Sequence, residues 1–371
     1  MRISQTIRAF QFFLERIIRS LFGSKDRIFY DYRFEFADLH PFFWRYYEIP
    51  ASKFCNRTNA RILHFVHHPK VTDQRPFIIE PNDHPLAPAC RVEPFENLAR
   101  LEYVRDIYLQ PNCKRILVES KGQEDLFRHY FPDPDITAKC EIIHLGTVPK
   151  LIDWPKKYDR IRNGNIRYLC LASDFDKKGV DVVLNAWCEY HTAENSDQLL
   201  LACPNIPEHY QRLLAGKGVK WIREAPLTMG QKSHLHSMSD VAIAPLHTDG
   251  GANVIEAFEY GLPVVTMRCQ RSESQNGNKN CIVIDVPFYF YDAQHYGIQW
   301  RTFQEFFLIL QESKRLGEFD GVKNEFVNQF RAFKNNPRQI YDLGIRSYEY
   351  AAGEFSLAVR NAKVARIYAE I

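Results

Sequence analysis

The sequence predicts two α/β domains, each built on a doubly wound parallel β-sheet. Three observations lead to this prediction. The chain has 371 residues, which is enough for two domains of ordinary size. Short apolar runs alternate with helical patterns between residues 61 and 144. The same alternation begins again at Ile166, after a polar stretch, and continues to Val265.

An N-terminal segment, residues 1–22, precedes the first domain. Apolar residues recur in it at three- and four-residue spacing, which predicts an amphipathic helix. Basic side chains accompany this apolar stripe at Arg2, Arg8, Arg16 and Arg19. Two interpretations remain open for this helix. It lies in a membrane interface through its apolar face, or the same face packs against the first domain.

The first domain is expected at residues 23–148. Its strands are predicted where short apolar runs occur, at 61–66, 77–80, 115–119 and 141–144. Helical patterns lie between these runs at 96–108 and 122–130, and Pro132 stops the second of them. Strands that alternate with helices in this way favour a parallel sheet.

The second domain is expected at residues 149–352, after a linker at 147–165 that contains two prolines and an Asn-Gly pair. Its strands are predicted at 166–172, 198–202, 219–223, 241–244 and from Leu262 onward. A helical pattern at 230–238 precedes the strand at 241–244. Further helices are predicted at 302–316, 319–331 and 336–371, and residues 353–371 are assigned to a closing helix.

The turn after the strand at 241–244 is the most informative feature of the chain. Gly250 and Gly251 form the turn, and a helical pattern follows as far as Gly261. A helix that begins directly after a strand presents free backbone N–H groups and the positive end of its dipole. This arrangement binds phosphate well. Glu256 lies about one turn into the helix, within reach of a ribose beside that phosphate.

Two segments resemble motifs of the retaining glycosyltransferases with the GT-B fold. The family pattern is Glu, seven residues, then Glu-Ala-Met-Ala-x-Gly-x-Pro-Val-Val, and residues 256–265 read Glu-Ala-Phe-Glu-Tyr-Gly-Leu-Pro-Val-Val. The segment Lys178-Gly179-Val180-Asp181 is similar to the family's Lys-Gly-Val-Asp helix start. Thr248 stands where the family has its first Glu, with Asp249 as the nearest acid, and Ser173 falls near the family's Arg.

The resemblance implies two domains that face each other across a cleft, with the closing helix crossing back to the first domain. It also implies roles for individual residues. Lys178 and the helix N-terminus stabilise the departing diphosphate of a nucleotide sugar, and Glu256 holds the ribose. Thr248 or Asp249 contacts the sugar hydroxyls. The donor-binding set implied is Ser173, Lys178, Arg223, Thr248, Asp249, Gly250, Gly251, Ala252, Asn253 and Glu256.

A histidine of the first domain is also implied, because in the family one such residue faces the donor sugar. His84 is the candidate, with His67 and His68 as alternatives. The competing interpretation is that Asn82, Asp83 and His84 form a capped turn, since these residue types favour turns. The catalytic set is therefore His84, Lys178 and Glu256. Arg223 and Glu224 are candidates for contact with the nucleotide base.

The function implied is a retaining hexosyltransferase-type glycosyltransferase. It would transfer a sugar from a nucleotide-sugar donor to a glycan, lipid-linked or other acceptor in polysaccharide or glycoconjugate synthesis. In the family this requires no metal and no cofactor. Two alternatives remain. One is a non-catalytic partner subunit that binds nucleotide or glycan, which the replaced Glu and Arg favour. The other is a nucleotide-sugar epimerase with the GT-B fold.

Composition limits the other classes of function. The net charge is only +3, which argues against nucleic acid as a partner. The nine cysteines are dispersed without a Cys-x-x-Cys pair, which argues against a metal site and favours a reducing compartment. No apolar run approaches the roughly twenty residues that cross a bilayer. We therefore expect a cytoplasmic location, or a peripheral one on the inner face of a membrane through residues 1–22.

Overall fold

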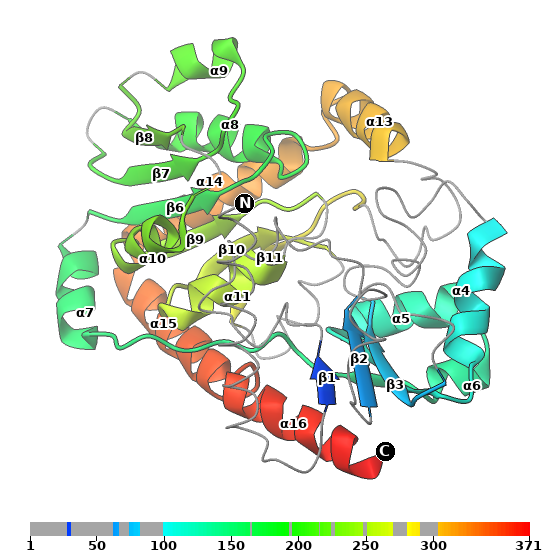
Figure 1. Cartoon of the computed structure of the whole chain (residues 1–371). Coiled ribbons are helices and arrows are strands. Elements are labelled where there is room, and N and C mark those ends of the chain that lie inside the picture. The colour runs from blue at the N-terminus through cyan, green and yellow to red at the C-terminus, as the bar shows by residue number, and fades with distance from the viewer. Residues whose placement is uncertain are drawn as a thin grey trace, which may run out of the picture.

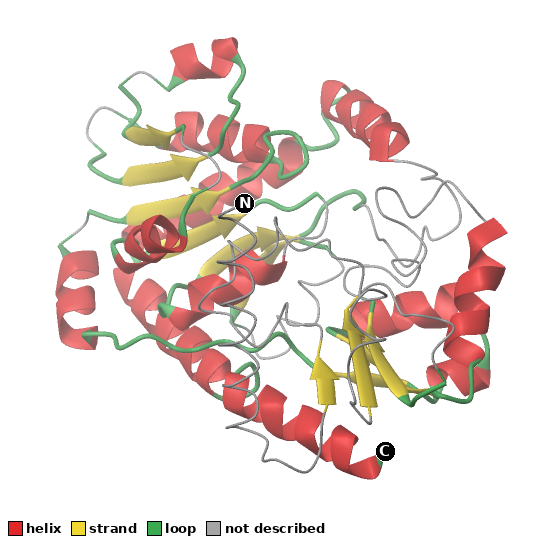
Figure 2. Ribbon diagram, in the orientation of Figure 1, coloured by secondary structure: helices red, strands yellow, loops and turns green. Residues whose placement is uncertain are grey.

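The computed structural model describes residues 28–30, 62–66, 74–81, 99–163, 165–192, 195–214, 216–223, 227–247, 251–269, 280–289 and 303–371. Within these ranges the chain forms two α/β domains, each with its own parallel sheet (Figures 1 and 2). The predicted fold class is therefore confirmed. The predicted N-terminal helix at 1–22 lies outside the described residues.

The first sheet contains five described strands, all parallel, and their order in space follows the chain. They are β1 (Ile28–Tyr30), β2 (Ile62–Val66), β3 (Phe77–Glu80), β4 (Cys113–Val118) and β5 (Cys140–Ile142). Its helices are α4 (Ala99–Leu109), α5 (Lys121–Tyr130) and α6 (Pro134–Thr137). The four predicted strands are found with their ends shifted by no more than two residues. The short β1 was not predicted.

Both faces of the first sheet are covered, because successive side chains of a strand point to opposite sides. Leu63 and Phe65 of β2 belong to a buried cluster with α4, α5 and α6. Ile62 and Ile78 belong to a second cluster on the other face, which the end of the chain completes. The side chain of Ser120 caps α5 by accepting a 3.1 Å hydrogen bond from the backbone N–H of Gln123.

The second sheet has six described parallel strands in the order β11-β10-β9-β6-β7-β8. In chain order they are β6 (Arg167–Leu171), β7 (Gln198–Ala202), β8 (Val219–Ile222), β9 (Val241–Ala244), β10 (Val264–Met267) and β11 (Cys281–Ile284). The helices between them are α8 (Val180–Tyr190), α9 (Glu208–Leu213), α10 (Met229–Ser237) and α11 (Gly251–Glu259). Strands β7 and β9 have the predicted bounds, whereas β11 and α9 were not predicted.

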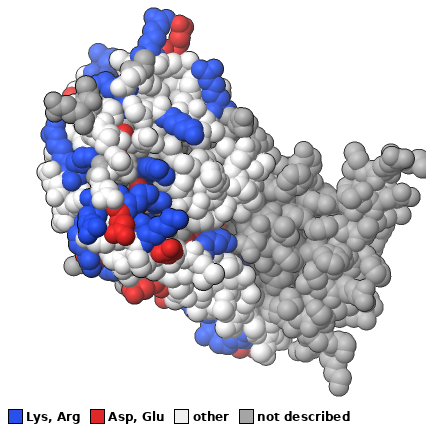
Figure 3. All heavy atoms as spheres, turned by 90° about the vertical axis from the view of Figure 1, so that its left-hand side faces the viewer, with Lys and Arg blue, Asp and Glu red and all other residues white. Residues whose placement is uncertain are grey.

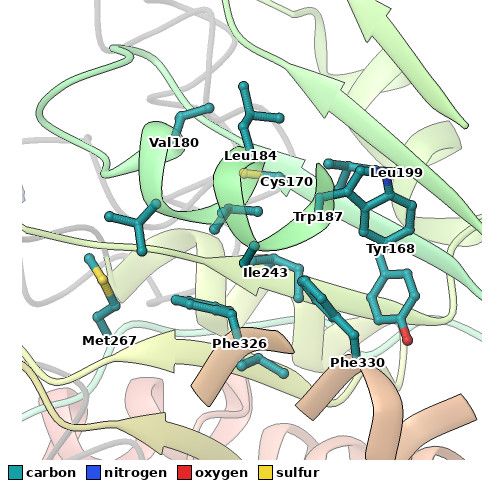
Figure 4. Close-up of a cluster of buried hydrophobic side chains, with 14 of the residues drawn as sticks. Tyr168, Cys170, Val180, Leu184, Trp187, Leu199, Ile243, Met267, Phe326 and Phe330 are labelled. Carbon is teal, nitrogen blue, oxygen red and sulfur yellow. The ribbon is translucent and has the colours of Figure 1, made fainter. Parts of the chain in front are cut away.

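The larger core of the second domain lies between this sheet, α8 and α14 (Asp320–Asn335) (Figure 4). Trp187 of α8 is fully buried there, with its ring centroid 5.4 Å from that of Tyr168 and 5.5 Å from that of Phe330. Its indole N–H donates a 2.7 Å hydrogen bond to the carbonyl of Lys217. A side chain buried to this extent contributes about 3 kcal/mol to folding.

The predicted linker at 147–165 is wrong in part, because it contains helix α7 (Trp154–Arg162). The Asp153 carboxylate caps this helix by accepting from the backbone N–H of Lys156, and Pro155 lies in its first turn. Proline occurs both in loops and in the first turn of helices, so its presence in the sequence does not distinguish the two. The helix packs on the second domain, where Trp154 contacts Tyr341 in an edge-to-face geometry.

The chain ends with α13 (Phe303–Arg315), α14, α15 (Pro337–Ala352) and α16 (Leu357–Glu370). The helical stretch predicted at 336–371 is interrupted between α15 and α16. At this interruption the backbone of Thr147 accepts from Leu357 and donates to Phe355, at 2.9 and 2.7 Å. The two segments that connect the domains are thus bonded to each other, and α16 extends from there along the first sheet (Figure 1).

A buried polar cluster attaches α16 to the first sheet. Arg360 donates a 2.7 Å hydrogen bond to the Glu80 carboxylate at the end of β3. The same carboxylate oxygen lies 2.9 Å from Nε2 of His64, and Nδ1 of His64 lies 2.6 Å from the Tyr368 hydroxyl. These four side chains join β2 and β3 to a helix from the far end of the chain.

The surface of the second domain carries charges of both signs. Figure 3 shows the side of the molecule on which α7 lies, and the Lys and Arg side chains there form several groups that include Asp or Glu. In the part of the chain that the structure describes, no helix combines the length and the apolar character needed to span a bilayer.

Candidate functional site

The order of the second sheet reverses between β6 and β9. These strands are hydrogen-bonded neighbours, with Leu169 opposite Ala242 and Cys170 opposite Ile243. The chain leaves β6 toward β7 and leaves β9 toward β10, in opposite directions across the sheet. Ligands of such sheets bind at the carboxyl ends of the strands, where the order reverses. The connections that follow β6 and β9 therefore define the candidate site.

The connection after β6 is a compact turn that brings Lys178 to the start of α8. The backbone N–H groups of Gly179 and Val180 both donate within the turn, to the carbonyls of Asp176 and Phe175. Lys178 is half-buried, and Ser173 is exposed at the beginning of the turn. The turn thus presents its cation beside the first turn of a helix.

Gly179 allows this connection to approach the one that follows β9. Its φ angle is +63°, which favours glycine. A Cβ atom at this position would lie 2.7 Å from the carbonyl oxygen of Pro245 and 2.9 Å from Nε2 of His247. The Lys-Gly pair of the motif therefore combines a cation with the residue that permits close packing of the two connections.

The connection after β9 leads into α11, whose N-terminus faces the end of β6. The side-chain amide of Asn253 donates a 3.2 Å hydrogen bond to the carbonyl of Leu171, the last residue of β6. The backbone of Gly251 and Ala252 belongs to the first turn of α11. Thr248, Asp249 and Gly250 lie outside the described residues. Helix α11 therefore begins beside the turn that carries Lys178.

His247 is a buried residue of this region that the sequence did not single out. Its side chain is 1% exposed, and within the described part of the chain neither ring nitrogen has a hydrogen-bond partner. Burial holds the pKa of His247 well below its usual range, and the positive charge of Lys314 lowers it further. The ring is therefore neutral and lies directly behind the Gly179 turn, where it contacts Phe319.

Glu256, in the second turn of α11, faces α10. Its carboxylate oxygens lie 3.2 and 3.4 Å from the ammonium of Lys232. The two side chains are about one-quarter exposed, at 23% for Glu256 and 25% for Lys232. Lys232 was also not identified from the sequence, because nothing in a helical pattern marks which distant carboxylate a lysine meets.

Arg223 follows β8 at the same edge of the sheet and is exposed. Its guanidinium lies 4.1 Å from the centroid of the Trp221 ring, in a cation–π contact. Trp221 is itself held by a 2.8 Å hydrogen bond from its indole N–H to the carbonyl of Cys203. Glu224, the neighbouring candidate, lies outside the described residues, as do His67, His68 and His84 of the first domain.

The structure thus brings together part of the predicted set. Lys178, Asn253 and the start of α11 adjoin one another where β6 and β9 end. Glu256 and Arg223 lie on elements that follow β9 and β8 at the same edge. Among the described residues, no group of three or more His, Cys, Asp or Glu side chains is arranged to hold a metal ion.

Comparison with known proteins agrees with this geometry. Residues 166–292 match the family described as Glycosyl transferases group 1. This range contains the second sheet and both connections described above. No curated protein matches the chain in sequence.

Three solved structures resemble the chain over most of its length. WaaG, a glycosyltransferase involved in lipopolysaccharide biosynthesis, is 15% identical, with a TM-score of 0.55 over 85% of this chain and 80% of that one. Anabaena Alr3699/HepE, solved with UDP and glucose, is 10% identical, with a TM-score of 0.57 over 86% and 81%. Sucrose-phosphate synthase of Thermosynechococcus elongatus is 13% identical, with a TM-score of 0.58 over 86% and 76%.

At such low identities the likeness defines the fold, which is the two-domain GT-B architecture. Residues 166–292 of the chain form a glycosyl transferases group 1 domain within it.

Proposed function

We propose that this protein is a glycosyltransferase that moves a sugar from a nucleotide-sugar donor to a glycan or lipid-linked acceptor, with retention of anomeric configuration. The observation that carries the proposal is the juxtaposition of the Lys178 turn and the N-terminus of α11 at the reversal point of a group 1 domain. A cation and a helix N-terminus side by side suit a diphosphate.

The donor's diphosphate is assigned to Lys178 and the backbone N–H groups of residues 250–253. As the sugar leaves, negative charge grows on the diphosphate. An ammonium and backbone N–H groups that are already in place therefore stabilise the transition state more than the ground state. Glu256 is assigned to the ribose, Arg223 to the neighbourhood of the base, and Thr248 or Asp249 to the hydroxyls of the sugar. These assignments need neither a metal ion nor an enzymic nucleophile.

The acceptor is assigned to the first domain, with His84 as the candidate that faces the donor sugar. In a retaining reaction without an enzymic nucleophile, the acceptor oxygen attacks on the face that the diphosphate vacates. Closure of the two domains around the donor would exclude water, which otherwise competes as acceptor. We also propose that the protein acts in polysaccharide or glycoconjugate synthesis. In the same proposal, residues 1–22 place it peripherally on a membrane.

The first test is thermal stabilisation of the purified protein by UDP-, GDP- and ADP-sugars. A ligand that binds only the folded state raises the melting temperature. We expect one nucleotide class to raise it for the wild type and the shift to shrink in Lys178→Ala and Glu256→Gln. Turnover of that donor, followed by NMR of the product, then reports the anomeric configuration. Inversion would contradict the retaining assignment.

One observation favours a non-catalytic partner subunit instead. Thr248 and Ser173 replace the two charged residues of the family pattern on the donor side. A subunit of this kind would bind the nucleotide sugar without consuming it. Transfer of sugar to any acceptor, or hydrolysis of the donor at a rate above that of Lys178→Ala, would exclude this alternative.

A further inference from the structure

The ion pair between Lys232 and Glu256 lies at the carboxyl edge of the second sheet. Helix α10 begins after β8 and α11 begins after β9, so the first turns of both helices are at this edge. Lys232 is the fourth residue of α10, and Glu256 is the sixth of α11. Because each side chain is about one-quarter exposed, the pair is accessible to a ligand that binds there.

The backbone of Lys232 is held in place by the residues that follow it. Its carbonyl lies 2.9 Å from Nδ1 of His236, which donates to it. The His236 ring is buried and stacks on Tyr260, the residue that follows α11, with centroids 5.1 Å apart and planes 14° from parallel. The Tyr260 hydroxyl donates a 2.8 Å hydrogen bond to Oγ of Ser233. These contacts fix α10 against α11 and leave the Lys232 ammonium a short reach to Glu256.

The ammonium approaches both oxygens of the Glu256 carboxylate, at 3.2 and 3.4 Å. A carboxylate has about four lone-pair sites, so each oxygen keeps one site that Lys232 does not use. Two remaining sites on neighbouring oxygens match two adjacent hydroxyl donors. A vicinal diol such as the 2′,3′-diol of a ribose has this arrangement.

Charge gives a second reason for the pairing. A lone carboxylate near a bound diphosphate repels it, and the repulsion is strongest in a partly buried site, where water screens less. An ammonium in contact with the carboxylate offsets this repulsion.

We propose that Lys232 is a positioning residue that holds the Glu256 carboxylate toward the ribose diol of the donor, and that the site consequently selects ribonucleoside diphosphates over their 2′-deoxy analogues. This inference rests on the function proposed above, since it assigns Glu256 to the ribose. It adds a residue and a substrate class to that function.

The experiment measures dissociation constants by calorimetry for UDP, GDP and ADP and for their 2′-deoxy counterparts. The ratio of the deoxy to the ribo constant reports the contact with the 2′-hydroxyl. A hydrogen bond to a charged group is worth about tenfold or more in affinity. We expect a ratio of about ten for the wild type with the nucleotide that binds, and a ratio close to one for Glu256→Gln.

The informative variants are Lys232→Met and Lys232→Arg. Methionine keeps most of the side-chain volume without the charge, and we expect it to reduce the ratio to about threefold or less. Arginine retains the positive charge, so Lys232→Arg should keep most of the preference for the ribonucleotide over its 2′-deoxy analogue. Lys220→Met removes an exposed cation from β8 of the same domain and should leave the ratio unchanged. Melting temperatures of the free proteins report separately any loss of contact between α10 and α11.

The outcomes separate the two proposals. If the wild type binds none of these nucleotides, the proposed function fails and this inference fails with it. If the wild type discriminates and Glu256→Gln does not, but Lys232→Met keeps the full ratio, the donor site stands and the role of Lys232 is wrong. A lower melting temperature of Lys232→Met with an unchanged ratio would show that the lysine only joins the two helices.

Discussion

The side-chain amide of Asn253 donates a hydrogen bond of 3.2 Å to the backbone carbonyl of Leu171, and so joins the first turn of α11 to the last residue of β6. A second contact joins the same two regions, because Gly179 packs against the carbonyl of Pro245. Main-chain groups take part in both contacts. The spacing between the Lys178 turn and the N-terminus of α11 is therefore set by one side-chain contact and one backbone contact.

Lys178 should dominate binding of the diphosphate. We expect Lys178→Ala to weaken binding of the cognate nucleoside diphosphate about tenfold or more, since the alanine removes a charge-assisted contact. Calorimetry at two salt concentrations would measure the dissociation constants. The affinity of the wild type should depend more steeply on salt than the affinity of Lys178→Ala. Lys177→Ala is the matched control, because Lys177 is the exposed neighbour in the same turn. Equal losses for the two variants would count against the assignment.

Gly179 should be intolerant of any side chain. In Gly179→Ala the new Cβ would lie 2.7 Å from the Pro245 carbonyl, and the backbone would be strained at φ +63°. Gly216→Ala isolates the backbone strain, because Gly216 has φ +73° and no atom within 4 Å of its Cβ position. We expect a cost of about 1–2 kcal/mol at Gly216 and a larger cost at Gly179. Urea unfolding measures the loss of unfolding free energy in each variant. Similar losses would show that the backbone moves enough to relieve the contact between the new Cβ and the Pro245 carbonyl.

Glu80 should make the protein sensitive to acid. Burial alone would raise the pKa of Glu80, but the charge of Arg360 and the hydrogen bond from His64 outweigh it and lower the pKa from 4.5 to about 2. Between these pH values the unfolded state binds more protons, so the free energy of unfolding falls as the pH falls from about 4.5 to about 2. The loss is on the order of 3 kcal/mol.

Acid titration of the free energy of unfolding tests the role of Glu80. Glu80→Gln should be less stable than the wild type at pH 7 and should lose less stability between pH 4.5 and 2. Glu102→Gln, on the exposed side of α4, should follow the wild type. A profile for Glu80→Gln that parallels the wild type throughout would remove this carboxylate as a source of the acid sensitivity.

Lys157 should change the stability with the same sign as Glu80 but in a different range, above pH 7. It is buried, and its Nζ donates to the carbonyls of Tyr260 and Gly261 at 3.0 and 2.6 Å. Burial lowers the pKa of Lys157 to about 7, against the opposing charge of Asp240. Because an unfolded lysine keeps its proton up to about pH 10.5, the unfolded state binds more protons above pH 7. This group therefore makes the free energy of unfolding rise with pH, by at most about 1.4 kcal/mol per unit.

The pH dependence of Lys157 is measured as a difference between variants. The free energy of unfolding of the wild type minus that of Lys157→Met should increase between pH 7 and pH 9. Lys156→Met, its exposed neighbour on α7, should show a difference that does not change with pH. If the Lys157→Met difference also stays constant, the ammonium keeps its proton in the folded state.

Local patterns determined what could be predicted from the sequence. The strands β7 and β9 are short apolar runs bounded by polar residues, and both were found with the predicted bounds. The proposed phosphate site uses two local features, the turn that carries Lys178 and the helix start at Gly251, and each lies within a short stretch of sequence. A short stretch of sequence is enough to indicate each feature, although their proximity in space depends on the packing of the two connections.

The missed features are contacts between distant segments. Lys232 and Glu256 are 24 residues apart, and only the packing of α10 on α11 brings them together. His247 looks like a surface residue in its polar sequence context, yet the Gly179 turn and Phe319 bury it. Helix α7 was missed for a different reason, since its capping aspartate and its proline are equally typical of a loop.

The attachment of α16 has a consequence for synthesis of the protein. Val364 and Ile367 of this helix fill a cluster on the first sheet together with Ile62 and Ile78. The chain emerges from the ribosome N-terminus first, so the first domain leaves it long before α16 does. Among the described residues, the face of the sheet that carries Ile62 and Ile78 is covered by this 14-residue helix, which is made after both sheets. The domain that is made first is thus the last to complete its core, and during that interval a chaperone would find it exposed.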